Sequence, residues 1–65
     1  MKIVYQGTET ETSAPTVGAF LEGKGVAPGT AVVEYAGAVY APGDSLDVPL
    51  AEGASLNAFR IVAGG

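Results

Sequence analysis

The sequence of 65 residues has no cysteine and no histidine. The absence of cysteine excludes a disulfide framework, a thiolate metal site and a cysteine nucleophile. Without histidine, general base catalysis near neutral pH requires a carboxylate or a lysine with a strongly shifted pKa, and the serines have no imidazole to activate them. Glu9 and Glu11, two residues apart on an expected strand, make only half of a metal site. We therefore predict that the isolated chain is not an enzyme and binds neither a metal nor another cofactor.

Basic residues are scarce as well, since three lysines and arginines stand against seven acidic residues, for a formal net charge of −4. This charge has the wrong sign for holding phosphate backbones, so we expect no nucleic-acid partner. The acidic residues are spread along the chain, as on a solubilising surface or one that docks to a basic patch of another protein. There is neither the apolar run of a signal peptide nor one long enough to span a bilayer. We expect a soluble, cytoplasmic protein that has no membrane partner and is a monomer when free.

Hydrophobic residues make up 48% of the chain, which is enough for the core of one small domain. The sequence contains no internal repeat, linker or low-complexity segment. We predict a single domain over residues 1–65 with a flexible C-terminal tail over residues 63–65. Because covalent staples are absent, its stability depends on the core.

The N-terminal part of the chain predicts a β-hairpin. Residues 1–6 are β-branched and aromatic, and residues 8–13 alternate threonine with glutamate, with a turn through Gln6-Gly7. In this register Ile3 and Tyr5 share the core face while the glutamates face water.

A change to helical period follows the hairpin. Thr16 can cap a helix, and Gly25 can end it. Between them Val17, Phe20 and Leu21 recur on one face. The two internal glycines weaken such a helix by about 0.5 to 1 kcal/mol each relative to alanine. The helix therefore depends on tertiary packing.

The rest of the chain predicts three more strands. Two short ones, over residues 31–35 and 38–41, turn at Ala36-Gly37. An irregular segment begins at Pro42-Gly43, and a final strand covers residues 56–62. The irregular segment is expected to be anchored by Leu46, Val48 and Leu50 and to turn again at Gly53.

This order of elements predicts an α+β fold. A small mixed sheet of four to five strands with one helix packed on one face covers the core economically, because a right-handed connection through the helix carries the chain across the sheet. The arrangement is a β-grasp, or ubiquitin-like, fold.

The last strand is expected to present two different faces. If Leu56 and Ala58 face the helix, alternation puts Phe59 and Ile61 on the opposite face, where the helix cannot cover them. Exposed apolar groups on small proteins often mark partner-binding sites. Two alternatives remain: loop residues cover Phe59, or the register is shifted by one residue. Arg60, the only charge in the segment, steers the tail, anchors a carboxylate of a partner or is merely solvated.

The chain carries, in this order, the segments "MKIVYQG", "TVGAFLEGKGV", "VVEYAGAVYAP", "PLAEGAS" and "RIVAGG". Together with the total length and the terminal Gly-Gly, they resemble the small sulfur carrier proteins of bacterial thiamine biosynthesis, the ThiS family. The resemblance covers the whole chain, and its specificity lies in the order of the segments. The chain departs from the family at Ala36-Gly37, where Asn-Gly is common, at Pro42-Gly43, where a basic residue follows the proline, and at Gly53-Ala54, where Gly-Asp is usual.

The resemblance implies a chemistry at the C-terminus. In that family the terminal glycine, here Gly65, is adenylated by a ThiF-like enzyme that uses ATP, and a sulfur donor protein supplies the sulfur of the resulting thiocarboxylate. Thiazole synthase (ThiG-like) then receives the sulfur. Gly64 serves as a spacer, because a residue without Cβ passes through a narrow channel. Ala63 completes the thin arm that contacts the partner.

Other functions remain open at this point. Small subunits of molybdopterin synthase look similar at the tail, although they are usually longer at the front and in the middle. A ubiquitin-like modifier joined to lysines through an isopeptide bond, or a binding module that never reacts, is also compatible. A terminal Gly-Gly is also found as a frayed or artificial end. The final acceptor of the sulfur is left undetermined.

Overall fold

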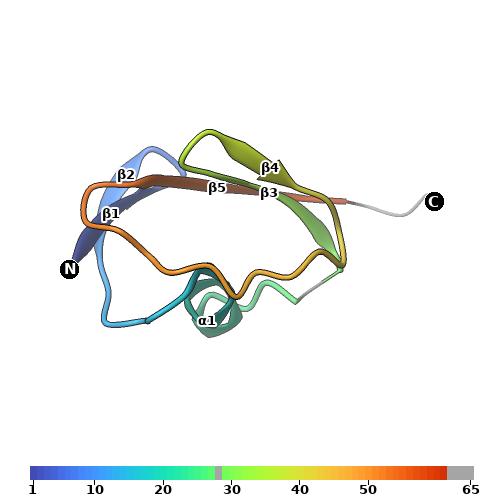
Figure 1. The fold of residues 1–65 in the computed structure, drawn as a ribbon, viewed down its shortest axis with the longest axis horizontal. Helices are drawn as coiled ribbons and strands as arrows, with labels where there is room; N and C mark the ends of the chain where they lie inside the picture. Colours follow the sequence, from blue (N-terminus) through green and yellow to red (C-terminus); the bar gives the residue numbers. More distant parts are fainter. Residues whose placement is uncertain (28, 62–65) are drawn as a thin grey trace.

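The computed structural model of the chain describes residues 1–27 and 29–61 (Figure 1). Its five strands form one sheet in the order β2-β1-β5-β3-β4. Strands β1 and β5 run parallel, and the other neighbours are antiparallel. The predicted α+β fold, with a mixed sheet and a helix, is therefore confirmed. The elements are β1 (Lys2–Tyr5), β2 (Thr8–Glu11), α1 (Val17–Gly23), β3 (Ala31–Tyr35), β4 (Ala38–Tyr40) and β5 (Ser55–Arg60).

The sheet and the helix form two layers (Figure 1). Helix α1 lies against one face of the sheet, together with the irregular segment that leads from β4 to β5. The Tyr5 ring meets the Phe20 ring edge to face, with their centroids 4.9 Å apart, and so joins sheet to helix. Nothing among the described helices is long and apolar enough to cross a membrane. The buried core consists of Ile3, Val17, Phe20, Leu21, Val33, Tyr35, Leu50, Leu56 and Ala58.

The N-terminal hairpin forms in the predicted register. Gln6 and Gly7 make its turn with φ angles of 51° and 81°, the pair of left-handed conformations that a tight two-residue hairpin turn requires. Both strands are shorter than the predicted ranges 1–6 and 8–13. The turn takes up Gln6, and the chain leaves the sheet after Glu11 on its way to the helix.

Both ends of α1 are capped as the sequence predicts. The Thr16 hydroxyl oxygen accepts a hydrogen bond from the Ala19 N–H at 3.1 Å, which satisfies one of the free donors of the first turn. At the other end Gly25 has a φ of 79°. The next residue, Val26, donates its N–H to the Leu21 carbonyl at 2.9 Å, which is the bond of a Schellman ending.

One face of α1 is buried, and a glycine helps to bury it. Val17, Phe20 and Leu21 are all buried, as predicted. A Cβ built on Gly18 would lie 3.2 Å from the Leu46 carbonyl oxygen, and the Gly18 N–H donates to that same oxygen at 2.9 Å. The glycine that weakens the helix by its propensity is therefore what lets the irregular segment approach it.

The middle hairpin turns where predicted, with φ angles of 50° at Ala36 and 86° at Gly37. Strand β3 has the predicted limits, but β4 ends at Tyr40 rather than at Ala41. Ala41 is drawn into a turn instead, because its N–H donates to the Asp44 carboxylate at 2.8 Å. The Asp44 N–H donates back to the Ala41 carbonyl at 3.0 Å.

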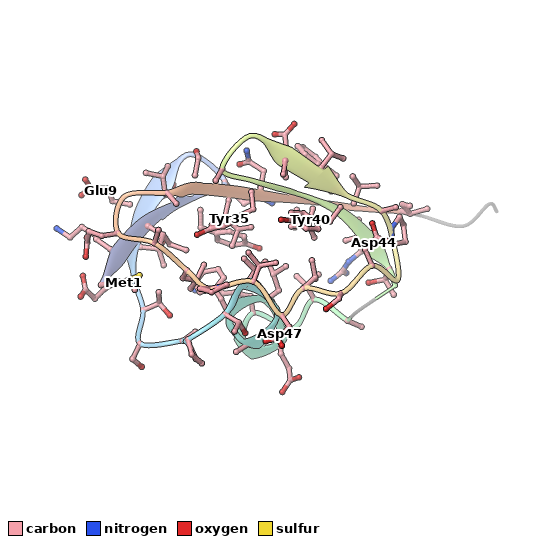
Figure 2. All side chains as sticks on the ribbon, viewed as in Figure 1. Met1, Glu9, Tyr35, Tyr40, Asp44 and Asp47 are labelled. Carbon is pink, nitrogen blue, oxygen red and sulfur yellow. The ribbon has the colours of Figure 1, made fainter. Side chains whose placement is uncertain are left out.

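The segment over residues 41–54 is irregular, as expected, and Tyr35 ties it to the sheet. Its hydroxyl group donates to the Pro49 carbonyl at 3.0 Å and accepts from the Ala51 N–H at 2.8 Å. Tyr35 lies between the two layers (Figure 2). These bonds fix the approach to β5. Of the three predicted anchors, Leu50 is buried and Leu46 and Val48 are half-buried.

Candidate functional site

Strand β5, which carries the predicted partner-binding residues Phe59 and Arg60, lies between β1 and β3. It spans Ser55–Arg60 and so begins one residue earlier than predicted. The Ile61 N–H still donates to the Thr30 carbonyl at 2.8 Å. Pairing with the β3 side therefore continues to the last described residue, while the predicted strand end at Val62 lies outside the described residues.

The side chains of β5 alternate between two environments, as predicted. Leu56 is fully buried and Ala58 is 9% exposed on the helix side. Phe59 is 55% exposed and Ile61 is 50% exposed on the other side. Both alternatives to this arrangement are therefore wrong: no described loop covers Phe59, and the register is not shifted.

Two valines extend this apolar surface across the sheet. Val32 lies directly opposite Phe59, and opposite residues of antiparallel strands share a face. Val39 pairs with Glu34 on the same face and is 67% exposed. The outer patch, as we call it, consists of Val32, Val39, Phe59 and Ile61.

Polar side chains border the outer patch on the same face. Asn57 lies opposite Glu34, and its side-chain amide donates to the Glu34 carboxylate at 3.3 Å. An apolar centre with a polar rim is the usual composition of a protein-docking surface. The helix-free face of the sheet therefore combines exposed apolar side chains with polar neighbours.

Arg60 is not part of the outer patch. Alternation turns its side chain to the helix side, where it lines a cavity of about 250 Å³ together with Ala58 and Lys24. The structure thus brings Phe59 and Ile61 together and separates Arg60 from them. The three predicted contacts belong to two surfaces of one strand.

The predicted reactive segment, Ala63, Gly64 and Gly65, lies outside the described residues. Its role stays a prediction. In sequence it follows Ile61, and hence the outer patch, by a single residue, Val62.

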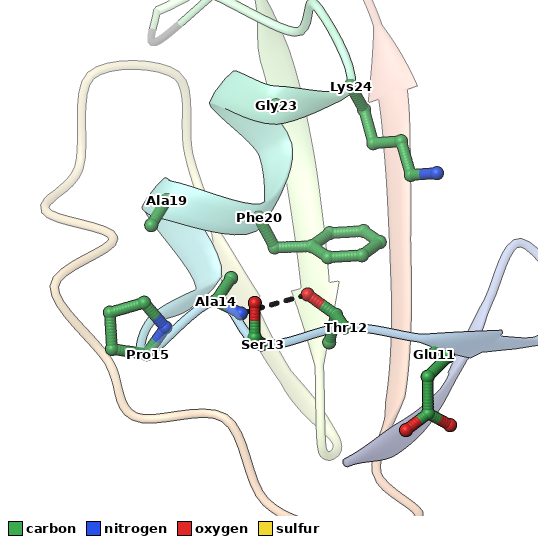
Figure 3. Close-up of a pocket in the computed structure, with 9 residues that line it drawn as sticks. All are labelled: Glu11, Thr12, Ser13, Ala14, Pro15, Ala19, Phe20, Gly23 and Lys24. Atoms are coloured by element: carbon green, nitrogen blue, oxygen red, sulfur yellow. Dashed lines mark hydrogen bonds between the residues drawn. The ribbon is translucent and has the colours of Figure 1, made fainter.

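A hollow of about 460 Å³ lies beside α1, along the connection from β2 (Figure 3). The Phe20 ring and small side chains line it, and the Thr12 hydroxyl oxygen accepts a hydrogen bond from the Ala14 N–H at 3.0 Å. Among the described residues, the charged ones in its wall are Glu11 and Lys24. Across the described residues, His, Cys, Asp and Glu side chains nowhere gather in groups of three that suit a metal ion.

Sequence reasoning missed three contributors to these surfaces. Val32 and Val39 belong to the outer patch, and the predicted turn at Ala36-Gly37 already fixed the register that places them there. Lys24 joins Arg60 at the smaller cavity. No local signal indicates that the two residues line one cavity, because they come from different layers.

Compared with known proteins, the chain matched no family model, no curated protein and no solved structure.

Proposed function

We propose that this protein is a ubiquitin-like sulfur carrier whose Gly65 carboxylate is adenylated and then converted to a thiocarboxylate. The sulfur is delivered to the thiazole of thiamine, as in the ThiS family. The observation that carries the proposal is the outer patch at the end of β5, next to the segment that continues as Val-Ala-Gly-Gly. A docking surface beside a glycine arm is what a carrier needs in order to present its terminus to another protein's active site.

The topology supports this proposal. A hairpin, a helix, a second hairpin and a final strand follow one another, and the final strand lies parallel to the first in the centre of the sheet. That order is compatible with the β-grasp arrangement, which ubiquitin-like carriers share. Fold alone does not decide function, so the weight of the proposal rests on β5 and the terminus.

The chemistry assigns a single role to this chain, which is to supply a carboxylate on a thin arm. Attack of the Gly65 carboxylate on the α-phosphate of ATP forms an acyl-adenylate and releases pyrophosphate. Hydrosulfide supplied by the donor protein then attacks the acyl carbon and displaces AMP, which leaves with one carboxylate oxygen, so that the thiocarboxylate remains. ATP belongs to the partner, a ThiF-like adenylating enzyme. Gly64 lacks a Cβ and adopts most backbone angles, so it suits a narrow active-site channel.

Docking is proposed to use the outer patch. Burying Phe59 and Ile61 against a partner removes apolar surface from water, which is favourable, and large aromatic side chains often dominate such interfaces. The adenylating enzyme and thiazole synthase are the partners that this proposal implies. It places the protein in the cytoplasm, as a monomer between encounters.

Intact-mass measurement tests the proposal directly. The full chain is incubated with the adenylating enzyme of the same cell, ATP and the sulfur donor. We expect a mass increase equal to the exchange of one oxygen for sulfur, located in the C-terminal peptide. A chain lacking Gly65 is the control and should fold normally but gain no sulfur. An unchanged mass in the presence of an enzyme that demonstrably binds the protein overturns the proposal.

Other products of the same reaction point to the other functions. An isopeptide bond to a lysine of another protein identifies a modifier. Transfer of the sulfur to a pterin precursor instead of the thiazole precursor identifies the molybdopterin pathway. The genes that neighbour this one provide a cheaper first indication of the pathway.

A further inference from the structure

The edge of β5 that faces β1 is paired over only part of its length. Strand β1 pairs with β5 at Val4 with Ser55 and at Tyr5 with Leu56, and then turns away into β2. On the other side, the Ile61 N–H donates to β3-side Thr30. Main-chain groups alternate along a strand, so those of residues 56, 58 and 60 point toward the β1 side.

The Gln6 side chain replaces the missing strand at the next position. Its amide nitrogen donates to the Ala58 carbonyl at 2.8 Å, and its amide oxygen accepts from the Ala58 N–H at 3.2 Å. One side chain therefore satisfies both main-chain groups of Ala58, as a paired residue of β1 would. The backbone N–H of Gln6 also donates to the Leu56 carbonyl at 3.0 Å.

Two residues further along, Arg60 has no such substitute. Within residues 1–27 and 29–61, its main-chain N–H and C=O make no hydrogen bond. An unpaired N–H and C=O on a strand edge is a ready position for an added extended segment.

The cavity of about 250 Å³ lies beside this edge, and its charge is unusual for the chain. It is lined by Tyr5, Gln6, Lys24, Val26, Ala31, Ala58 and Arg60. It therefore collects two of the three basic residues and none of the seven acidic ones.

Neither cation of the cavity has an acidic partner among the described residues. The salt bridges among the described residues join the N-terminus to Glu11 and Lys2 to Glu9, and neither involves Lys24 or Arg60. The Lys24 ammonium group lies 5.5 Å from the centroid of the Phe20 ring, a cation–π distance that holds it near the helix. A positive cavity on an otherwise acidic protein attracts an anion locally.

We propose that this cavity and the free edge at Arg60 form a binding site for an extended acidic segment of a partner protein. The segment pairs with the Arg60 main chain and places a carboxylate between the guanidinium group of Arg60 and the Lys24 ammonium group. A guanidinium group suits a carboxylate because both are planar and form two parallel hydrogen bonds. A peptide fits better than nucleic acid, because the unpaired Arg60 N–H and C=O can pair with a peptide main chain, which nucleic acid lacks. This site does not depend on any chemistry at Gly65.

Titration of the nitrogen-15-labelled full chain tests the site, with acetylated and amidated tetraglutamate as the probe. We expect amide shifts at Arg60 and Ala58 and in the Gln6 side chain. Arg60→Gln and Lys24→Gln should each weaken binding at least about tenfold, because each removes a charge-assisted hydrogen bond. Both residues are exposed, so both variants should fold.

Lys2→Gln is the matched control, since it removes the same charge from the third basic residue. Lys2 does not line the cavity, and its ammonium group lies 3.8 Å from the Glu9 carboxylate. It should change binding less than about twofold, as expected for a screened surface charge. An equal loss in Lys2→Gln and Arg60→Gln overturns the site. So do shifts confined to the outer patch, or inorganic phosphate at equal ionic strength moving the same amides as strongly as the peptide, because strand pairing is then not involved.

Discussion

The two halves of β5 share a backbone conformation but differ in surroundings. The first half, residues 55–58, is held on both edges, by β3 on one side and by β1 and the Gln6 side chain on the other. The second half, residues 59–60 together with Ile61 just beyond the strand, is held by the β3 side alone among the described residues. Apolar residues are buried in the first half and exposed in the second.

This difference separates the part of the strand that is held in the core from the part that we propose to bind partners. The hairpin turn at Gln6-Gly7 ends β1 and takes the chain away from β5, and helix α1 covers only the face that carries Leu56 and Ala58. The residues beyond are left with an open edge and an uncovered face. Both openings occur where the strand leads toward its predicted reactive end.

Leu56→Ala should have the largest effect on stability. The side chain is fully buried, and its truncation should lower the free energy of unfolding by about 3 kcal/mol. That is a large part of what a domain of this size possesses. Urea denaturation followed by circular dichroism measures the change. Ile61→Ala, on the exposed half, is the matched control and should cost less than about 1 kcal/mol; equal losses would erase the distinction between the halves.

Gln6→Ala should rank second. It leaves both main-chain groups of Ala58 without their partner, and the expected loss is about 1 to 2 kcal/mol. Hydrogen exchange at the Ala58 amide should accelerate with it. Gln6→Asn provides the control, because it retains an amide but is one methylene shorter. If the Ala58 amide exchanges at the wild-type rate in both variants, the Gln6 side chain does not act as a substitute strand.

Phe59→Ala should change stability by less than about 1 kcal/mol, because the ring is 55% exposed. Its effect should fall on docking instead, with affinity for the adenylating enzyme reduced at least about tenfold, as for an aromatic anchor. Isothermal titration calorimetry with the wild-type chain as reference measures this. Undiminished affinity would remove the outer patch from the docking surface.

Asn57→Ala should have the smallest effect and tests whether face or position decides. Asn57 lies in the well-held half of β5 but on the outer face, where it bonds Glu34 at 3.3 Å. Exposed polar pairs contribute little, so stability should change by no more than about 0.5 kcal/mol. A loss near that of Gln6→Ala in the same urea experiment would show that position along the strand outweighs the face.

Local signals in the sequence predicted most elements correctly. The sequence correctly located three features, because turn and cap chemistry acts within a few residues. They are the turn at Ala36-Gly37, the Thr16 cap and the helix end at Gly25. Element ends were less accurate. Strand β4 stops before Ala41 because the Ala41 N–H donates to the Asp44 carboxylate. Strand propensity alone does not predict whether such a residue extends the strand or joins the turn.

The candidate site was predicted only in part. The exposure of Phe59 and Ile61 followed from alternation once the helix-facing residues were identified. That Lys24 and Arg60 line one cavity could not be predicted, since it depends on where the helix ends relative to the sheet. The role of Gly18 could not be predicted either, because it depends on the close approach of Leu46 to the helix in the folded chain.

The sequence by itself determined the order of the elements, the face that each strand buries and the turns between them, because periodicity and local hydrogen bonding are encoded in neighbouring residues. Only the tertiary structure decided which part of β5 is open. That depends on where a strand from the other end of the chain stops pairing and on how far a single helix reaches across the sheet. Both are matters of long-range geometry, and they set the outer patch and the basic cavity on opposite sides of the same short strand.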